Sequence, residues 1–165
     1  MSKIINLPQK IKEHEFNLKD YSTEQFDEIK KNLIMKISDN RNMIELLKFL
    51  VQLTSRDDQF IQCGSNSLNM LIRMKVDLRN QSFKNIRMKN TSMIGGTFVR
   101  CNFNGSEFKN VDISGVKFNG AQLINCNWKN IKIHLKTIYI RKIKILIKQP
   151  YYIGLFGMLL SKGIN

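Results

Sequence analysis

The sequence has few of the residues that mark a disordered, secreted or membrane-spanning chain. It holds only two prolines and nine glycines in 165 residues, and 42% of its residues are hydrophobic, so it can bury a core. The N-terminal sequence MSKIINLPQK has no apolar h-region, and we therefore expect no secretory signal peptide. A membrane span needs roughly 20 apolar residues. The longest candidate, residues 151–160, has ten residues.

Cysteine and histidine are also scarce. The three cysteines, Cys63, Cys101 and Cys126, are odd in number and form no CxxC or Cys/His metal-binding spacing. We therefore expect reduced thiols in a cytoplasmic protein, with no metal and no cofactor. His14 and His134 are far apart in the sequence, and no paired-carboxylate spacing occurs. The sequence thus predicts no catalytic residues and no enzyme.

Acidic residues are outnumbered by basic ones. The chain has 13 Asp and Glu against 27 Lys and Arg, which gives a formal net charge of +14. Residues 1–55 carry 9 basic and 8 acidic side chains, residues 56–130 carry 11 and 5, and residues 131–165 carry 7 and none. The excess positive charge therefore belongs to the middle of the chain and its tail, and it favours acidic partners.

The first third of the chain has the pattern of packed helices. Ser22 and Gln25 are spaced as a capping box, and Tyr21 is placed to pack on Phe26 as a hydrophobic staple. Apolar residues then recur at helical spacing on either side of a polar break at 38–42: Phe26, Ile29, Leu33, Ile34 and Ile37 before it, and Ile44, Leu46, Leu47, Leu50 and Leu53 after it.

Two shorter helices are predicted next. Asp57 or Asp58 is placed to cap a third helix, and Ser65 to cap a fourth helix that runs to about residue 74. The apolar stripes indicate ordinary helix packing, with a groove for a partner helix as the alternative.

Residues 76–135 repeat with a period of five. Every fifth residue is apolar over twelve positions: Leu78, Phe83, Met88, Met93, Phe98, Phe103, Phe108, Ile113, Phe118, Leu123, Trp128 and Ile133. Two positions before each of them the residues are mostly small or β-branched, and two positions after them Asn or Gly recurs, with Arg100 as the exception. This period fits neither a helix nor a plain strand, but it fits short extended pieces joined by turns.

The phrases VDLRNQSFKN, CNFNGSEFKN and VDISGVKFNGAQL resemble pentapeptide repeats of the A(D/N)LxX type, over about 60 of 165 residues. Proteins of that family form right-handed β-helices of square cross-section with four pentapeptides per coil. The resemblance therefore implies about three coils, in which residues twenty apart stack. The predicted structural core consists of Leu78, Phe83, Phe98, Phe103, Phe108, Phe118, Leu123 and Trp128.

The predicted fold class is α+β. A helical N-terminal region and cap, residues 1–75, precedes a short right-handed parallel β-helix, residues 76–135, and a basic Ile/Lys-rich tail, residues 136–165. We expect the helices to cover the first coil, since an open coil exposes strand edges. The middle of the chain also resembles, more loosely, the pentapeptide segment of large NACHT/WD-repeat multidomain proteins. Because the chain has no GxxxxGK[ST] phosphate loop, we expect no ATPase activity.

The tail is open to three interpretations. Its alternating Ile and Lys residues favour a terminal cap or edge strand on the last coil. The other two are a poorly ordered end and an interfacial segment that binds anionic lipid.

One surface is a candidate for binding. With four units per coil, Lys89, Lys109 and Lys129 stack in a column beside Arg87, and Glu107 partly offsets their charge. This face would meet an anionic partner, or else serve as a solvated face that keeps the solenoid soluble.

We expect a non-enzymatic protein-interaction or scaffold module with an unknown protein partner, or a second copy joined through open coil ends. The alternatives are an electrostatic binder of nucleic acid or anionic membrane, and a fragment of a larger repeat protein without independent function.

Overall fold

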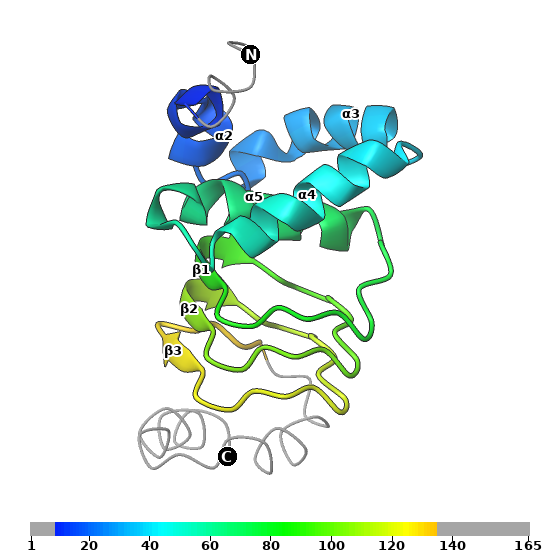
Figure 1. The fold of residues 1–165 in the computed structure, drawn as a ribbon. Coiled ribbons are helices and arrows are strands. Elements are labelled where there is room, and N and C mark those ends of the chain that lie inside the picture. The colour runs from blue at the N-terminus through cyan, green and yellow to red at the C-terminus, as the bar shows by residue number, and fades with distance from the viewer. Residues whose placement is uncertain (1–8, 135–165) are drawn as a thin grey trace, which may run out of the picture.

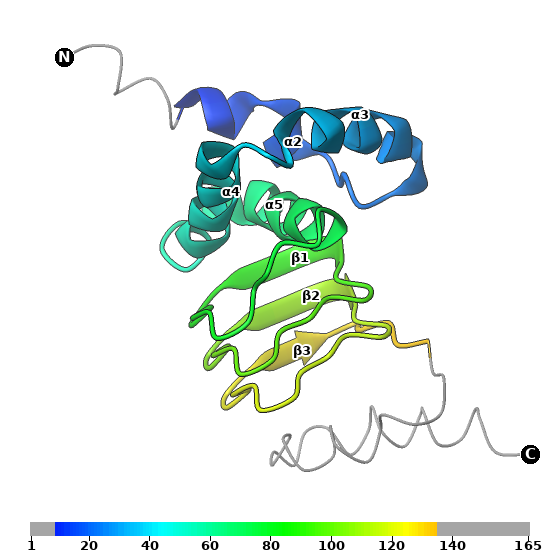
Figure 2. The same ribbon diagram turned by 90° about the vertical axis from the view of Figure 1, so that its right-hand side faces the viewer.

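The computed structural model describes residues 9–134. Helices lie across one end of a small solenoid, and the strands stack away from them, as Figures 1 and 2 show from two sides. In chain order the elements are α2 (Glu15–Leu18), the 3-10 turn η1 (Glu24–Phe26), α3 (Asp27–Ile37), α4 (Arg41–Leu53), the 3-10 turn η2 (Asp58–Phe60), α5 (Ile61–Arg73), β1 (Arg87–Ser92), β2 (Glu107–Asp112) and β3 (Asn127–Lys129). The predicted tail, residues 136–165, lies outside the described residues.

Helices α3 and α4 follow the predicted apolar stripes with two exceptions. Asn40, in the polar break, caps α4 by accepting a hydrogen bond from the backbone N–H of Met43 at 3.2 Å. Leu47 and Leu50 of α4 and Ile37 of α3 are buried. The exceptions are Ile29, which is 52% exposed, and Leu46, which is 38% exposed. Neither side chain is buried as its spacing predicts.

Two predicted helix caps are wrong. Ser22 caps no helix, because its hydroxyl donates to Asp20 Oδ1 at 2.6 Å and η1 begins two residues later, without a side-chain cap. Ser65 does not start a helix either, because it lies inside α5, which runs on directly from η2. Asp57 does cap η2 by accepting from the N–H of Gln59 at 2.9 Å. The third and fourth predicted helices are therefore one 3-10 turn continued as α5.

The segment before α3 is fastened to α5 by a buried amide. Asn66 Nδ2 donates to the carbonyls of Phe16 and Lys19, at 2.7 and 2.8 Å, and Asn66 Oδ1 accepts from the N–H of Tyr21 at 3.0 Å. The Tyr21 ring stacks on Phe26 with centroids 4.2 Å apart, so the contact expected of a hydrophobic staple is present. Together these contacts fix the loop that follows Asp20.

The strands form one parallel sheet in the order β1-β2-β3. Residues that pair differ by twenty in number, as in Met88 with Phe108 and Phe108 with Trp128. Isolated bridges elsewhere in the solenoid repeat the same offset, as in Thr97 with Lys117. Twenty residues equal four pentapeptides. The predicted columns are therefore the columns that stack.

The interior of the solenoid is a stack of aromatic rings. The Phe83 and Phe103 centroids are 5.1 Å apart, those of Phe98 and Phe118 are 5.9 Å apart, and those of Phe108 and Trp128 are 4.2 Å apart. Seven of the residues predicted as the core are at most 7% exposed: Leu78, Phe83, Phe98, Phe103, Phe108, Phe118 and Leu123. Trp128, in the last strand, is half-buried.

The recurring Asn and Gly residues occupy turns in the left-handed region of backbone space. Asn90, Asn110 and Asn130 have φ between 45° and 55°, a conformation that asparagine tolerates. Their side chains form a ladder, in which Asn110 Nδ2 donates to Asn90 Oδ1 at 2.8 Å and Asn130 Nδ2 donates to Asn110 Oδ1 at 3.0 Å. Arg100, the sequence exception, adopts φ 58° all the same.

Polar side chains of α5 close the first edge of the sheet. Ser65 Oγ accepts from the backbone N–H of Lys89 at 2.9 Å, and the Ser65 carbonyl accepts from Thr91 Oγ1 at 3.1 Å. Asn69 Nδ2 donates to the carbonyl of Ser92 at 2.7 Å. These groups replace the neighbouring strand that β1 lacks on this side, so α5 is the cap that the solenoid requires.

Candidate functional site

The three predicted lysines form a column on the outer face of the sheet. Lys89, Lys109 and Lys129 are paired in register across β1, β2 and β3. Lys109 and Lys129 are exposed, and Lys89 is half-buried beside the helices. Adjacent strands lie about 4.8 Å apart, so the three lysine side chains are attached to closely spaced backbone positions. We call these residues the lysine column.

Arg87 is held by the helical cap. Its Nε donates to the carbonyl of Thr54 at 2.9 Å, and its guanidinium also pairs with Asp58. The charge of Arg87 is therefore already offset by Asp58. Of the four residues predicted to face an anionic partner, the three of the lysine column then keep a charge that is unpaired among the described residues. In sequence Asp58 lies 29 positions away from Arg87, so only the packing of η2 against β1 reveals the pair. Glu107, which pairs in register with Arg87, is exposed beside the column.

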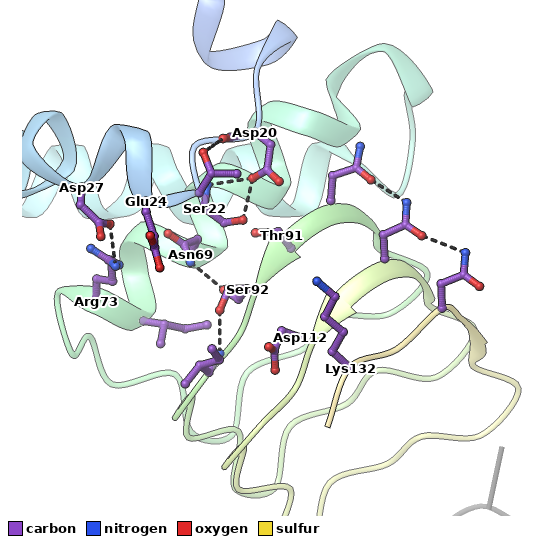
Figure 3. Close-up of a pocket in the computed structure, with 16 residues that line it drawn as sticks. Asp20, Ser22, Glu24, Asp27, Asn69, Arg73, Thr91, Ser92, Asp112 and Lys132 are labelled. Carbon is purple, nitrogen blue, oxygen red and sulfur yellow. Dashed lines mark hydrogen bonds and ion pairs between the residues drawn. The ribbon is translucent and has the colours of Figure 1, made fainter. Parts of the chain in front are cut away.

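A groove lies where the helical cap overhangs the sheet. Figure 3 shows it between the loop that follows Asp20, the last turn of α5 and the face of β1. Its volume is about 940 Å³. The Asn ladder, Thr91 and Ser92 line it from the sheet side. Sequence reasoning did not find this groove, because no motif links a helical loop to strands some seventy residues later.

The groove differs in charge from the rest of the chain. Its lining has four carboxylates, Asp20, Glu24, Asp27 and Asp112, and only two cations, Arg73 and Lys132. The remainder of the molecule is strongly basic. A concave surface of opposite sign concentrates field lines, so the groove favours cationic groups.

Part of this charge is already neutralised within the fold. Asp27 Oδ1 lies 2.8 Å from Lys30 Nζ and 2.9 Å from a guanidinium nitrogen of Arg73. The hydrogen bond from Lys30, aided by the charges of Lys30 and Arg73, lowers the pKa of Asp27. Asp27 therefore joins α3 to α5, and the carboxylates left for a ligand are those of Asp20, Glu24 and Asp112.

Cys63, Cys101 and Cys126 are buried, and none of them forms a disulfide among the described residues. Burial raises the pKa of the Cys63 and Cys126 thiols to about 11, so neither is a thiolate near neutral pH. Cys101 Sγ donates to the carbonyl of Leu78 at 2.8 Å. His134 is exposed at the end of the solenoid, with its backbone N–H bonded to Ser114 Oγ at 2.7 Å.

Between residues 9 and 134, no group of three or more His, Cys, Asp or Glu side chains could hold a metal ion. Over the same residues, no helix combines the length and the apolar character needed to cross a bilayer.

Comparison with known proteins identifies the repeat. The family described as "Pentapeptide repeats" matches residues 74–110 and 97–127, in 8 copies. No curated protein matches the chain in sequence. Among solved structures, the chain is similar to a pentapeptide-repeat protein from the cyanobacterium Cyanothece 51142, with 15% identity and a TM-score of 0.15. That match covers 34% of this chain and 46% of the other, so it spans less than half of that protein's length.

The family match, the twenty-residue register and the left-handed corners agree with one another. Such repeats imply a right-handed parallel β-helix, which accounts for the parallel sheet seen here. The looser resemblance to NACHT/WD-repeat proteins stays a prediction. Residues 74–127 of the chain carry pentapeptide repeats.

Proposed function

We propose that the chain is a non-enzymatic interaction module and that the lysine column binds an acidic surface of a protein partner. The observation that carries this proposal is the in-register pairing of Lys89, Lys109 and Lys129. Like charges placed directly opposite each other on adjacent strands destabilise a sheet. In the unbound protein the three lysine ammonium groups repel one another, and an acidic partner would reduce this repulsion.

The column is also preorganised. Its backbone positions are set by the parallel pairing, and the first of them is anchored because the N–H of Lys89 donates to Ser65 Oγ at 2.9 Å. The paired backbone loses little conformational entropy when a partner binds, so the ordering cost is confined to the lysine side chains. We infer further that the twelve repeats make about three coils, which gives a short, flat binding face.

A protein partner is favoured over nucleic acid by the position of the aromatic rings. The phenylalanines of the repeat lie in the core, where they stack on one another. Single-stranded nucleic acids bind proteins largely by stacking bases on exposed aromatic side chains. Duplex DNA and anionic lipid, which need only positive charge, remain the alternative partners and are arms of the test.

The test compares two triple variants of the full chain. The first is Lys89→Gln, Lys109→Gln and Lys129→Gln. The matched control is Lys31→Gln, Lys36→Gln and Arg41→Gln, which removes three exposed charges from the helices. Binding to a fluorescent poly-glutamate peptide is measured across salt concentrations. We expect the column variant to weaken binding by about tenfold and the control by less than about twofold.

The probes separate the partner classes. Equal losses in the two variants, or no saturable binding of poly-glutamate at low salt, would overturn the proposal. If duplex DNA or phosphatidylserine vesicles bind more tightly than poly-glutamate, and the column variant weakens that binding as well, the lysine column is assigned to those partners instead. A pull-down with the intact chain and with the column variant then identifies the protein, because a specific partner is lost from the variant alone.

A further inference from the structure

The groove beneath the helical cap is a second surface, separate from the lysine column. We propose that it binds an extended peptide segment that carries lysine or arginine side chains. The groove has a volume of about 940 Å³, which is at the upper end of the range for ligand sites. Its walls come from distant parts of the chain, and the contacts of Asn66 with Phe16, Lys19 and Tyr21 hold the helical wall in place.

Three carboxylates are available to a cationic side chain. Within residues 9–134 the Glu24 carboxylate makes no hydrogen bond or ion pair, and it is exposed at the helical wall. Asp20 uses Oδ1 to accept from the N–H and the hydroxyl of Ser22, at 2.8 and 2.6 Å, which leaves Oδ2. On the sheet wall, Asp112 uses Oδ1 to accept from the N–H of Ser114 at 2.9 Å, and its Oδ2 lies 3.7 Å from His134 Nδ1, beyond hydrogen-bond distance. The Asp112 side chain is only 15% exposed. Carboxylates thus line both walls.

A buried acceptor lies at the base of the groove. Asn69 is 5% exposed, and its Nδ2 donates to the carbonyl of Ser92 at 2.7 Å, which fixes the orientation of the amide. Among the described residues nothing donates to Asn69 Oδ1. An acceptor buried without a donor has lost its hydration and gained no hydrogen bond in return, which destabilises the fold. A ligand ammonium or guanidinium that enters between Asp20, Glu24 and Asn69 would supply the missing donor. In Figure 3 these three side chains lie around the same part of the groove.

The lining also fits a peptide chain rather than a bare cation. Asn90, Asn110 and Asn130 present amides that can meet the backbone N–H and C=O groups of an extended segment. Ile72 and the exposed Ile94 offer apolar surface to the aliphatic stem of a lysine or arginine. A phosphate or an acidic peptide would be repelled by the carboxylates on both walls. The site therefore has the chemistry of a receptor for a basic segment.

The test uses the full chain and a blocked decapeptide of alternating alanine and lysine. The groove variant is Asp20→Asn, Glu24→Gln and Asp112→Asn, in which each amide keeps the acceptor oxygen that the fold uses. The matched control is Glu28→Gln, Asp39→Asn and Glu107→Gln, which changes the net charge equally at exposed sites that do not line the groove. We expect wild type and control to bind the peptide alike, and the groove variant to bind it about tenfold more weakly at low salt.

Three results would overturn the proposal. They are the absence of saturable binding by wild type, an equal loss in both variants, and competition by spermidine at concentrations equal to those of the peptide, which would assign the groove to polyamines. Melting temperatures of both variants show that each is folded. Sedimentation of the wild type in parallel tests a second copy of the chain as the occupant: a dimer that only the groove variant dissociates would replace the peptide as the ligand. A blocked, uncharged decapeptide of alternating alanine and glutamine should not bind.

Discussion

The helical cap and the repeat array bury different kinds of residue. In the array the inside is apolar, with Phe83, Phe98 and Phe103 at most 2% exposed. In α5 five of the ten buried residues are polar, among them Gln62, Asn66 and Asn69. The array stacks coils on coils, so most of its inward side chains fill space, and only small ones such as Ser106 and Cys101 also donate to backbone carbonyls. Helix α5 packs on an open strand edge, so its side chains must also satisfy backbone groups.

This difference shows where the hydrophobic pattern of the sequence predicts burial reliably. Within the array each coil repeats its neighbour, and burial follows the sequence period. At the first edge of the sheet, β1 has no neighbouring coil on the side of the helices. There the Ser65 hydroxyl accepts the hydrogen bond from Lys89 that a neighbouring strand would otherwise accept. Ser65 bonds both its own helix, through the carbonyl of Ile61, and the solenoid, through the N–H of Lys89.

The largest expected effect comes from the centre of the array. Phe103 is fully buried, and its ring lies between 5.1 and 6.0 Å from those of Phe83, Phe98, Phe108 and Phe118. Phe103→Ala should lower the free energy of unfolding by about 3–5 kcal/mol. Urea denaturation measures this, with Phe49→Ala as the control because Phe49 is 58% exposed on α4. Equal losses would mean that the aromatic stack does not dominate stability.

Within the helical cap, Gly64 of α5 leaves no room for a side chain against α4. A Cβ built there would lie 2.2 Å from Thr54 Cγ2 and 2.7 Å from the carbonyl oxygen of Leu50. Gly64→Ala should therefore force α4 and α5 apart and cost about 1–3 kcal/mol. Gly95 is the comparison, since its added Cβ meets nothing within 4 Å and only its φ of 70° resists substitution. A larger loss in Gly95→Ala than in Gly64→Ala would contradict the close approach of the two helices.

The polar closure of the sheet can be tested with two serines of the same helix. Ser65 and Ser67 are both fully buried and both donate to the carbonyl four residues earlier, but only Ser65 also accepts from Lys89. Ser65→Ala should cost about 1–2 kcal/mol, whereas Ser67→Ala should cost less than about 0.5 kcal/mol. Amide hydrogen exchange adds a local readout. Faster exchange at Lys89 in Ser65→Ala alone supports the cap, and unchanged exchange argues against it.

The smallest expected effect is a gain in stability at Arg100. Its φ of 58° is a conformation that asparagine tolerates better than arginine, and other corners of the array use asparagine. Arg100→Asn should raise the free energy of unfolding by about 0.5–1 kcal/mol, as measured by thermal melting. Lys117→Asn is the control, since Lys117 is exposed and does not have a positive φ. A decrease in stability for Arg100→Asn would show that the arginine side chain contributes more than the strain costs.

Much of the array could be predicted from the sequence. The period of five identifies the inward central residues, and the asparagines two positions after them identify the corners. The four units per coil that the family resemblance implies then place Leu78, Phe98 and Phe118 in one column. The lysine column is predicted in the same way, because a twenty-residue register aligns outward residues as well as inward ones. The family match to residues 74–110 and 97–127 agrees with this interpretation.

The cap was predicted less well for a physical reason. Helical spacing marks Ser65 as a cap and Ile29 as buried, but spacing says nothing about what lies across from a helix. The structure places Ser65 against a strand edge and leaves Ile29 52% exposed. It also pairs Arg87 with Asp58, which removes one residue from the predicted binding face.

The sequence by itself determined the five-residue repeat and the positions of its turns, because both follow from a pattern that recurs every five residues. The resemblance to a known family added the twenty-residue register. Only the tertiary structure decided how the first edge is closed and where the acidic groove lies. Those features join residues such as Asp20 and Asp112, or Asn69 and Ser92, whose proximity depends on how the helices dock on the first coil. No periodic pattern carries that information.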